Sequence, residues 1–153
     1  MKHIKLFEEH SKQPNLHIYD DQKFIELLEE TISPSSFICS YVASAIKMLE
    51  GDGVKVYGFS YDENPSSVYF SEEELQEGDH FAVLDDRFII DPWIFEEYNR
   101  SVFDLHKEGD RGVIKYIYGD KNNWTDITDI SDDFKVLFKD SYQNLIDFYN
   151  KQS

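Results

Sequence analysis

Hydrophobic residues recur every three or four positions in three stretches of the chain, and this spacing predicts three helices. The first covers residues 20–31, where acidic residues at the start are typical of an N-cap. The second follows Pro34 and its neighbouring serines and runs to Leu49, beyond which Gly51 and Gly53 favour its end. The third covers residues 132–149 near the C-terminus.

Between the second and third helices the pattern changes to alternation, which predicts strands. Residues 54–59 form one such stretch. Residues 80–84 and 87–91 are two apolar runs joined by Asp85 and Asp86, and they predict a tight β-hairpin. A two-residue turn there would place His80 directly opposite Asp91, on the same face of the sheet.

The remaining stretches carry weaker patterns. Residues 68–70 and 112–118 have strand composition, and residues 71–77 predict a short helical connector. The pattern at 93–110 assigns no element. The order of elements predicts a single α+β domain over residues 1–153, in which a cysteine-bearing helix packs on an antiparallel sheet, with one helix near each terminus.

The charge balance narrows the class of partner. The chain has 31 acidic and 15 basic residues, a formal net charge of −16, and the excess is spread along its length. Such a surface repels nucleic acid and anionic lipid and attracts a basic protein. We therefore expect no nucleic-acid or membrane partner, whereas the sequence leaves the oligomeric state open.

No signal peptide, membrane span or metal site is predicted. The first twenty residues lack an apolar run, and one cysteine forms no internal disulfide, so the sequence favours the cytoplasm or export without a signal peptide. His3, His10 and His17 lie seven apart, but Pro14 interrupts any helix that would align them. We expect no metal and no cofactor.

The residues that carry candidate chemistry are Cys39, His80 and Asp91. Cys39 falls in the first turn of the second helix, where free N–H groups favour a thiolate and predict a lowered thiol pKa. Asp91 opposite His80 would hold one nitrogen of the imidazole, which leaves the other nitrogen to act on a nucleophile. The alternative interpretations are a buried structural cysteine, a core histidine and a turn-forming aspartate.

A cysteine that opens a helix, followed by a strand with His and a neighbouring strand with Asp, resembles the papain-like and transglutaminase-like superfamily. The stretches 78–84 and 88–93 are similar to the His strand and the Asp-Pro strand of bacterial transglutaminase-like and arylamine-acetyltransferase-like proteins. The resemblance covers residues 35–93. It implies that Cys39 is the nucleophile, His80 the general base and acid, and Asp91 the orienting carboxylate. Ser40 stands where papain itself has Trp.

The resemblance also implies an oxyanion hole. One donor would be the backbone N–H of Cys39, which a helix N-terminus permits. Papain-like members use a Gln upstream of the Cys as the second donor, and Gln13 and Gln22 are the candidates here.

The leading hypothesis is amide chemistry through a thioester on Cys39, on a protein or peptide substrate. Peptidase, glutamine deamidase, peptidoglycan amidase and acyltransferase share these steps, and the small acidic chain favours a deamidase or amidase, including an effector role. Two alternatives remain open. One is a non-enzymatic acidic binder, such as an immunity protein that masks a basic partner, and the other is an inactive relative that uses the groove for binding.

Overall fold

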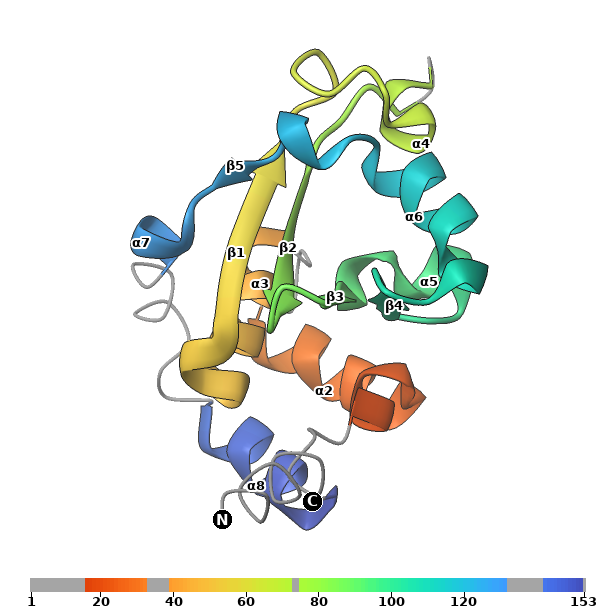
Figure 1. Ribbon diagram of the computed structural model, residues 1–153. Coiled ribbons are helices and arrows are strands. Elements are labelled where there is room, and N and C mark those ends of the chain that lie inside the picture. The colour runs from red at the N-terminus through yellow and green to blue at the C-terminus, as the bar shows by residue number, and fades with distance from the viewer. Residues whose placement is uncertain (1–15, 33–38, 73–74, 132–141, 153) are drawn as a thin grey trace, which may run out of the picture.

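The computed structural model describes residues 16–32, 39–72, 75–131 and 142–152. Its centre is an antiparallel sheet with the strand order β4-β3-β2-β1-β5 (Figure 1). The strands are β1 Val54–Phe59, β2 Asp79–Leu84, β3 Phe88–Ile90, β4 Val102–Asp104 and β5 Thr125–Asp126. The α+β class predicted from the sequence is confirmed, and the cysteine-bearing helix packs on the sheet.

Helices surround this sheet, and most of the short ones connect strands. The α-helices are α2 Gln22–Ile32, α3 Cys39–Glu50, α4 Val68–Ser71, α5 Phe95–Tyr98, α6 Arg111–Tyr118, α7 Thr128–Ser131 and α8 Tyr142–Gln152. The 3-10 helices are η1 Leu16–Asp20, η2 Gly51–Gly53, η3 Pro92–Ile94, η4 Glu108–Asp110 and η5 Lys121–Asn123.

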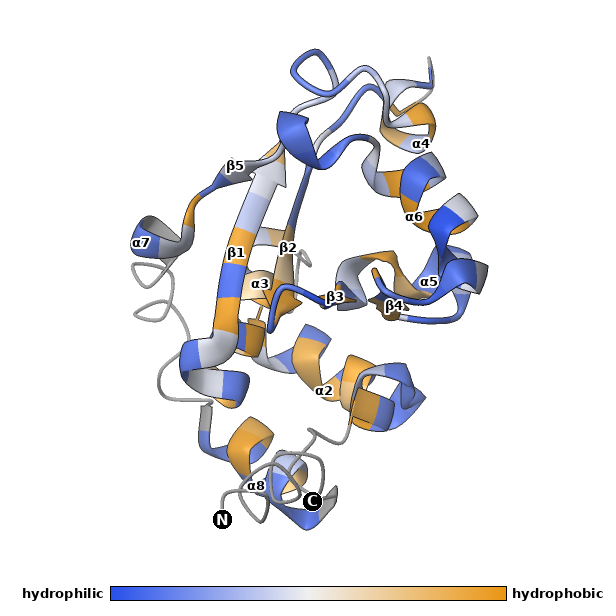
Figure 2. Cartoon of the chain, in the orientation of Figure 1, coloured by the Kyte–Doolittle hydropathy of each residue, from blue (hydrophilic) through white to orange (hydrophobic). Residues whose placement is uncertain are grey.

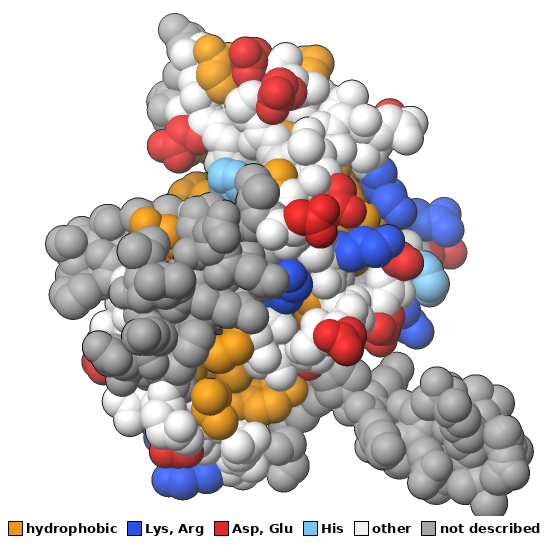
Figure 3. All heavy atoms as spheres, turned by 90° about the vertical axis from the view of Figure 1, so that its left-hand side faces the viewer, with side chains coloured by type: hydrophobic (Ala, Val, Ile, Leu, Met, Phe, Trp, Pro, Cys, Tyr) orange, Lys and Arg blue, Asp and Glu red, His pale blue; other side chains and the backbone are white. Residues whose placement is uncertain are grey.

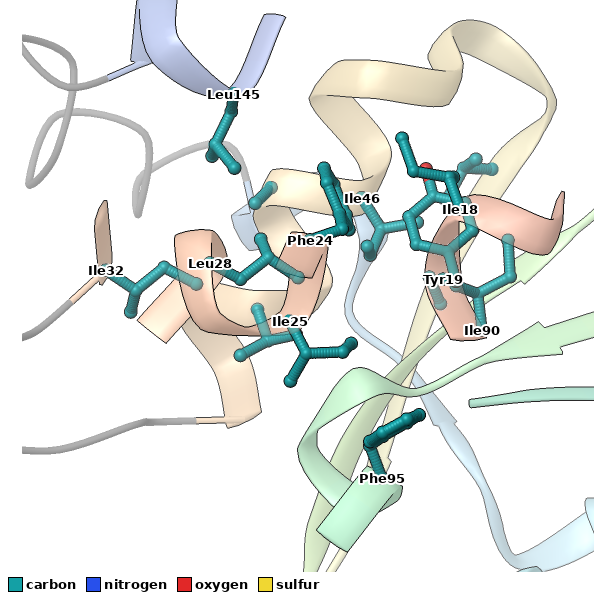
Figure 4. Close-up of a cluster of buried hydrophobic side chains, with 14 of the residues drawn as sticks. Ile18, Tyr19, Phe24, Ile25, Leu28, Ile32, Ile46, Ile90, Phe95 and Leu145 are labelled. Atoms are coloured by element: carbon teal, nitrogen blue, oxygen red, sulfur yellow. The ribbon is translucent and has the colours of Figure 1, made fainter. Parts of the chain in front are cut away.

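Helices α2 and α3 bury one face of the sheet, and α8 packs on α2. The alternation of apolar and polar residues along β1, visible as banding in Figure 2, directs Val54 and Val56 towards α3. The side chains of α2 meet those of α3, β3 and α8 in one hydrophobic cluster (Figure 4), which includes Phe24, Leu28, Ile46, Ile90, Phe95 and Leu145. Asp21 begins α2, because its carboxylate accepts the N–H of Lys23 at 2.9 Å.

Helices α4 and α6 bury the opposite face, and this second core is mostly aromatic. Tyr118 packs against Phe81 of β2 with ring centroids 4.8 Å apart, and Trp124 meets Phe81 edge to face at 4.9 Å. Each aromatic pair of this kind adds about 0.5–1.5 kcal/mol beyond the burial of its area. Strand β2 is therefore covered on both faces, by α3 on one and by α6 on the other.

Two predicted strands are wrong, because both segments are helical. Residues 68–70 belong to α4, whose N-cap is Ser67: its hydroxyl accepts the N–H of Phe70 at 3.2 Å. Residues 112–118 belong to α6, in which Ile114, Ile117 and Tyr118 share the buried face at helical spacing. In both segments tertiary packing overrides a strand-like composition.

The predicted hairpin exists, but its predicted register is wrong by one residue. Strand β2 ends at Leu84 and β3 begins at Phe88, so the loop includes Arg87 as well as the two aspartates. Both aspartates have positive φ angles, of 54° and 55°. Ala82 consequently pairs with Ile90, where a two-residue turn predicts Ile89.

The other predicted elements agree with the structure within a few residues. Residues 54–59 form β1, and the first two predicted helices are α2 and α3. The predicted terminal helix corresponds to α8, while its first part at 132–141 and the serines before α3 lie outside the described residues. Within the described ranges, no helix has the length and apolarity needed to span a bilayer.

Candidate active site

Cys39 and His80 lie side by side, although 41 positions separate them in the chain. The Cys39 Sγ atom is 3.4 Å from the Nδ1 atom of His80. Helix α3 supplies the thiol from its first residue, and β2 supplies the ring from the face that packs on α3. At this distance a neutral imidazole accepts the thiol proton when its own N–H is on Nε2.

A glycine in the neighbouring strand makes room for the imidazole. Gly58 of β1 pairs with His80 across the sheet. A Cβ atom at Gly58 would lie 2.7 Å from the His80 Cδ2 atom and 3.1 Å from Nε2. The ring therefore lies over β1, and its Nε2 edge faces away from β3, the strand that precedes Asp91.

The thiol and the imidazole share the wall of a pocket of about 470 Å³. The pocket lies at the end of β1, between the turn that follows this strand and strand β5. Its other lining residues are Gly58, Phe59, Ser60, Glu63, Gly78, Thr125 and Ile127. Both Cys39 and His80 are only partly buried. A substrate can therefore reach both groups together.

Burial sets the protonation of the pair, and the expected lowering of the thiol pKa is not observed. Burial, followed by the charge of Asp91, raises the pKa of Cys39 to about 11, while the backbone N–H groups of His80, Ser40 and Cys39 oppose this shift. Burial also lowers the pKa of His80 below its usual value of 6.5. At neutral pH the resting pair is therefore an uncharged thiol and an uncharged imidazole.

Asp91 lies behind the sheet, in the second core. Its Oδ2 atom accepts the Tyr118 hydroxyl at 2.7 Å, and its carboxyl group interacts with that of Asp79. Continuing the observed β2–β3 ladder places Asp91 beside Phe81, on the face opposite to His80. Among the described residues, no hydrogen bond joins Asp91 to His80, so the predicted direct contact between them is not found.

Asp79 and Asp91 form a buried carboxyl pair. Their side chains are completely buried, and both oxygens of Asp79 and Oδ1 of Asp91 receive no other hydrogen bond within the described residues. Burial first, and then the neighbouring carboxyl group, raises the pKa of Asp79 well above its usual range. One proton shared by the two groups joins one oxygen of each, because an ionised carboxylate cannot donate, and among the described residues one Asp79 oxygen is left without a donor.

Sequence reasoning missed Asp79, Tyr118 and Gly58. Asp79 carried a usable signal, because a charged residue next to His80 in an apolar strand must point to the opposite face. Tyr118 carried none, since its segment was predicted to be a strand. The importance of Gly58 depends on the register of β1 against β2, which the composition of β1 does not reveal.

The predicted oxyanion donors are only partly described. Gln13 lies outside the described residues. Gln22 is exposed in α2, where its side-chain amide lies 3.4 Å from the carboxylate of Glu26. The backbone N–H of Cys39 interacts with its own sulfur, and its role as an oxyanion donor stays a prediction.

No group of three or more metal-ligating side chains occurs in the part of the chain that the structure describes. Comparisons of the chain with protein-family models, curated proteins and solved structures find no match. The function must therefore be argued from the site itself.

Proposed function

We propose that the chain is a cysteine-dependent amide hydrolase, deamidase or acyltransferase that acts on a protein or peptide through a thioester on Cys39. The observation that carries this proposal is the 3.4 Å contact between the Cys39 sulfur and the His80 Nδ1 atom at the wall of an open pocket. A nucleophile and a base within hydrogen-bonding reach define the minimum machinery for covalent acyl transfer.

The protonation of the pair indicates general-base activation. His80 Nδ1 takes the thiol proton as the sulfur attacks the substrate carbonyl carbon, so a C–S bond forms and the carbonyl electrons move to oxygen. When the tetrahedral intermediate collapses, the C–N bond breaks and His80 returns the proton to the departing nitrogen. Water or another acceptor then attacks the thioester, loses a proton to His80, and frees the thiol.

Asp91 supports this chemistry from behind the sheet. Its charge acts on Cys39 without a hydrogen bond to the imidazole. A negative charge at this place opposes a thiolate but stabilises an imidazolium, which is the species that forms when His80 takes the proton. Asp91 is therefore assigned an electrostatic role in place of the direct orienting contact.

The proposal is tested with para-nitrophenyl acetate, an activated acyl donor. Cys39 is the sole cysteine of the chain, so an acetyl group on sulfur is identified by intact mass and by its loss in Cys39→Ala. We expect a burst of nitrophenolate equal to the protein concentration. His80→Ala should slow the burst about 10²–10⁴-fold, the usual contribution of a general base. His106→Ala is the matched control, because His106 is exposed.

The pH dependence gives a second readout. Because burial lowers the pKa of His80, the acetylation rate should reach its plateau at a lower pH than an ordinary histidine would give, and it should stay level through neutral pH. It should fall only at more acidic pH, as the imidazole takes up a proton. In His80→Ala the rate should instead climb through the alkaline range as the thiol ionises. Equal rates in His80→Ala and wild type would contradict the proposal.

A non-enzymatic acidic binder, or an inactive relative, is the second candidate. It is favoured by the net charge of −16 and by the raised pKa of Cys39, which keeps the thiol protonated. If the chain is such a binder, the Cys39 thiol should be acetylated slowly. Neither a substitution at His80 nor a change of pH below 8 should alter the acetylation rate. Tight binding of a basic protein by Cys39→Ala, without any burst in the wild type, would support it.

A further inference from the structure

We infer that Glu63 selects the substrate of the Cys39 pocket, and that the preferred substrate carries a lysine-like or arginine-like cation next to the reacting carbonyl. The inference rests on the proposed function, because it names the substrate class for the same pocket. Glu63 is the single acidic residue among the described residues that line this pocket.

The turn after β1 holds the Glu63 carboxylate in place. The N–H of Ser60 donates to Oε1 at 3.2 Å, and the Ser60 hydroxyl lies 2.9 Å from the same oxygen. The backbone N–H groups of Glu63 and Asn64 both donate to the Ser60 carbonyl at 3.1 Å. These bonds form a tight turn in which the Glu63 side chain reaches back to the Ser60 N–H, and this restricts the carboxylate beside the pocket before any ligand binds.

One oxygen of this carboxylate is available to a ligand. The two contacts of Ser60 with Glu63 both go to Oε1, and within the described part of the chain Oε2 has no donor. Asp62 adds negative charge beside it: its carboxylate lies 2.6 Å from the Ser60 hydroxyl, and this bond lowers its pKa. A positively charged group in the pocket would therefore meet a prepositioned acceptor.

The rest of the pocket suits the stem of a basic side chain. Ile127 is apolar, and the two glycines Gly58 and Gly78 leave the wall open. Phe59 borders the pocket, but its side chain is buried in the second core. No Lys or Arg occurs among the described lining residues. Lysine and arginine bury their methylene stems along apolar surface while the charged end finds an acceptor, which is the arrangement available between Ile127 and Glu63.

The net charge of the chain does not by itself produce this selectivity. At physiological ionic strength charges are screened beyond about 8 Å, so distant acids contribute little to a ligand at Cys39. In the face shown in Figure 3, acidic side chains lie at the upper end and again further down, where basic side chains lie beside them. A local effect of Glu63 can therefore be separated from the background by one substitution.

The test uses two reagents that modify the only cysteine and differ in charge. Trimethylammonioethyl methanethiosulfonate is cationic, and sulfonatoethyl methanethiosulfonate is anionic. With either, the Cys39 thiolate attacks the sulfenyl sulfur, methanesulfinate leaves, and a mixed disulfide forms. The ratio of the two rate constants, measured by intact mass at physiological salt, reports the potential at Cys39. Thiol ionisation and access affect both rates and cancel in the ratio.

We expect the ratio to favour the cationic reagent and to fall about three- to tenfold in Glu63→Gln, which keeps an acceptor for Ser60 but removes the charge. Glu96→Gln is the matched control, because Glu96 is an exposed acid on α5 and is not part of this pocket. It should leave the ratio unchanged.

An unchanged ratio in Glu63→Gln, or an equal fall in Glu96→Gln, would overturn the inference. Its failure can be told apart from failure of the proposed function, because disulfide formation needs only the Cys39 thiolate and no acyl transfer. If Glu63 governs the ratio and the acetyl burst is absent, the pocket selects cations without the proposed chemistry. If the burst depends on His80 and the ratio does not depend on Glu63, the reverse holds.

Discussion

Strand β2 separates two groups of ionisable side chains that differ in their access to solvent. On the α3 face, His80 and Cys39 open into a pocket. On the α6 face, Asp79 and Asp91 are sealed in an aromatic core with Tyr118. Asp79 and His80 are consecutive in β2, yet the first is buried in the core and the second borders an open pocket. The open pair can exchange its proton with a substrate, whereas the sealed pair can share a proton only internally.

This difference explains why burial has different consequences on the two faces. Partial burial keeps both Cys39 and His80 uncharged, and an uncharged acid–base pair costs little free energy to maintain. Complete burial of two carboxyl groups leaves, besides the oxygens that share a proton, one oxygen without a donor among the described residues, which costs about 1–3 kcal/mol. The Cys39–His80 pair therefore costs the fold little stability, whereas the Asp79–Asp91 pair lowers it.

The largest expected effect comes from filling the space under His80. A methyl group in Gly58→Ala would lie 2.7 Å from the His80 ring, so the ring must leave the position in which its Nδ1 atom meets Cys39. We expect the acetylation rate to fall about a hundredfold, which corresponds to about 2.7 kcal/mol, while the far-ultraviolet circular dichroism is unchanged. Gly112→Ala is the control, because no atom lies within 4 Å of a Cβ atom there. A normal rate in Gly58→Ala would show that the ring position is unimportant.

The next effect concerns the sealed face and is expected in stability. The folded-state pKa of Asp79 is raised, so its contribution to stability is complete below its unfolded pKa, near 3.9, and is lost as pH rises through the folded pKa. Asp79→Asn removes this loss. We expect the free energy of unfolding in urea to match wild type near pH 4 and to exceed it by about 1–3 kcal/mol at pH 8.

The outcome that would contradict this second prediction is a lower stability of Asp79→Asn at both pH values. Such a result would mean that the ionised carboxylate of Asp79 is itself stabilising. Asp52→Asn provides a comparison, because Asp52 is exposed and its substitution should not change the difference in stability between pH 4 and pH 8.

The smallest expected effect tests the role of Asp91. Since its carboxyl group bonds Tyr118 and not His80, Asp91→Asn should slow acetylation by no more than about tenfold, or about 1.4 kcal/mol. A carboxylate that orients the imidazole directly would cost about 10⁴-fold when replaced by Asn. A loss of that size would therefore return Asp91 to the triad predicted from the sequence. The burst assay with para-nitrophenyl acetate measures it.

Local patterns predicted the elements with strong periodicity. The apolar spacing of α2 and α3 and the alternation of β1 are properties of contiguous residues, and each agrees with the structure within a few residues. The same reasoning failed for α6, because Val, Ile and Tyr favour strands until the buried face of a helix is known. Short elements such as α4 depend on a single cap, Ser67, and their composition alone does not predict them.

In the candidate site, too, some residues could be predicted from the sequence and others could not. The sequence was sufficient to select Cys39 and His80, because only one cysteine exists and His80 begins a clearly apolar strand. It was insufficient for Asp91, since one additional loop residue, Arg87, changes the register of β3. Side chains in a strand alternate between faces, so an error of one residue moves a carboxylate from the open face to the sealed one.

By itself, the sequence determined the α+β class, the main helices and the nucleophile–base candidates, because these depend on neighbours within a few positions of the chain. The tertiary structure alone decided that Cys39 meets His80, that Gly58 admits the ring, and that Asp79 and Asp91 share a buried core with Tyr118. These contacts join residues up to 41 positions apart. They depend on strand register and helix packing, which are set by the burial of the whole core and not by any local pattern.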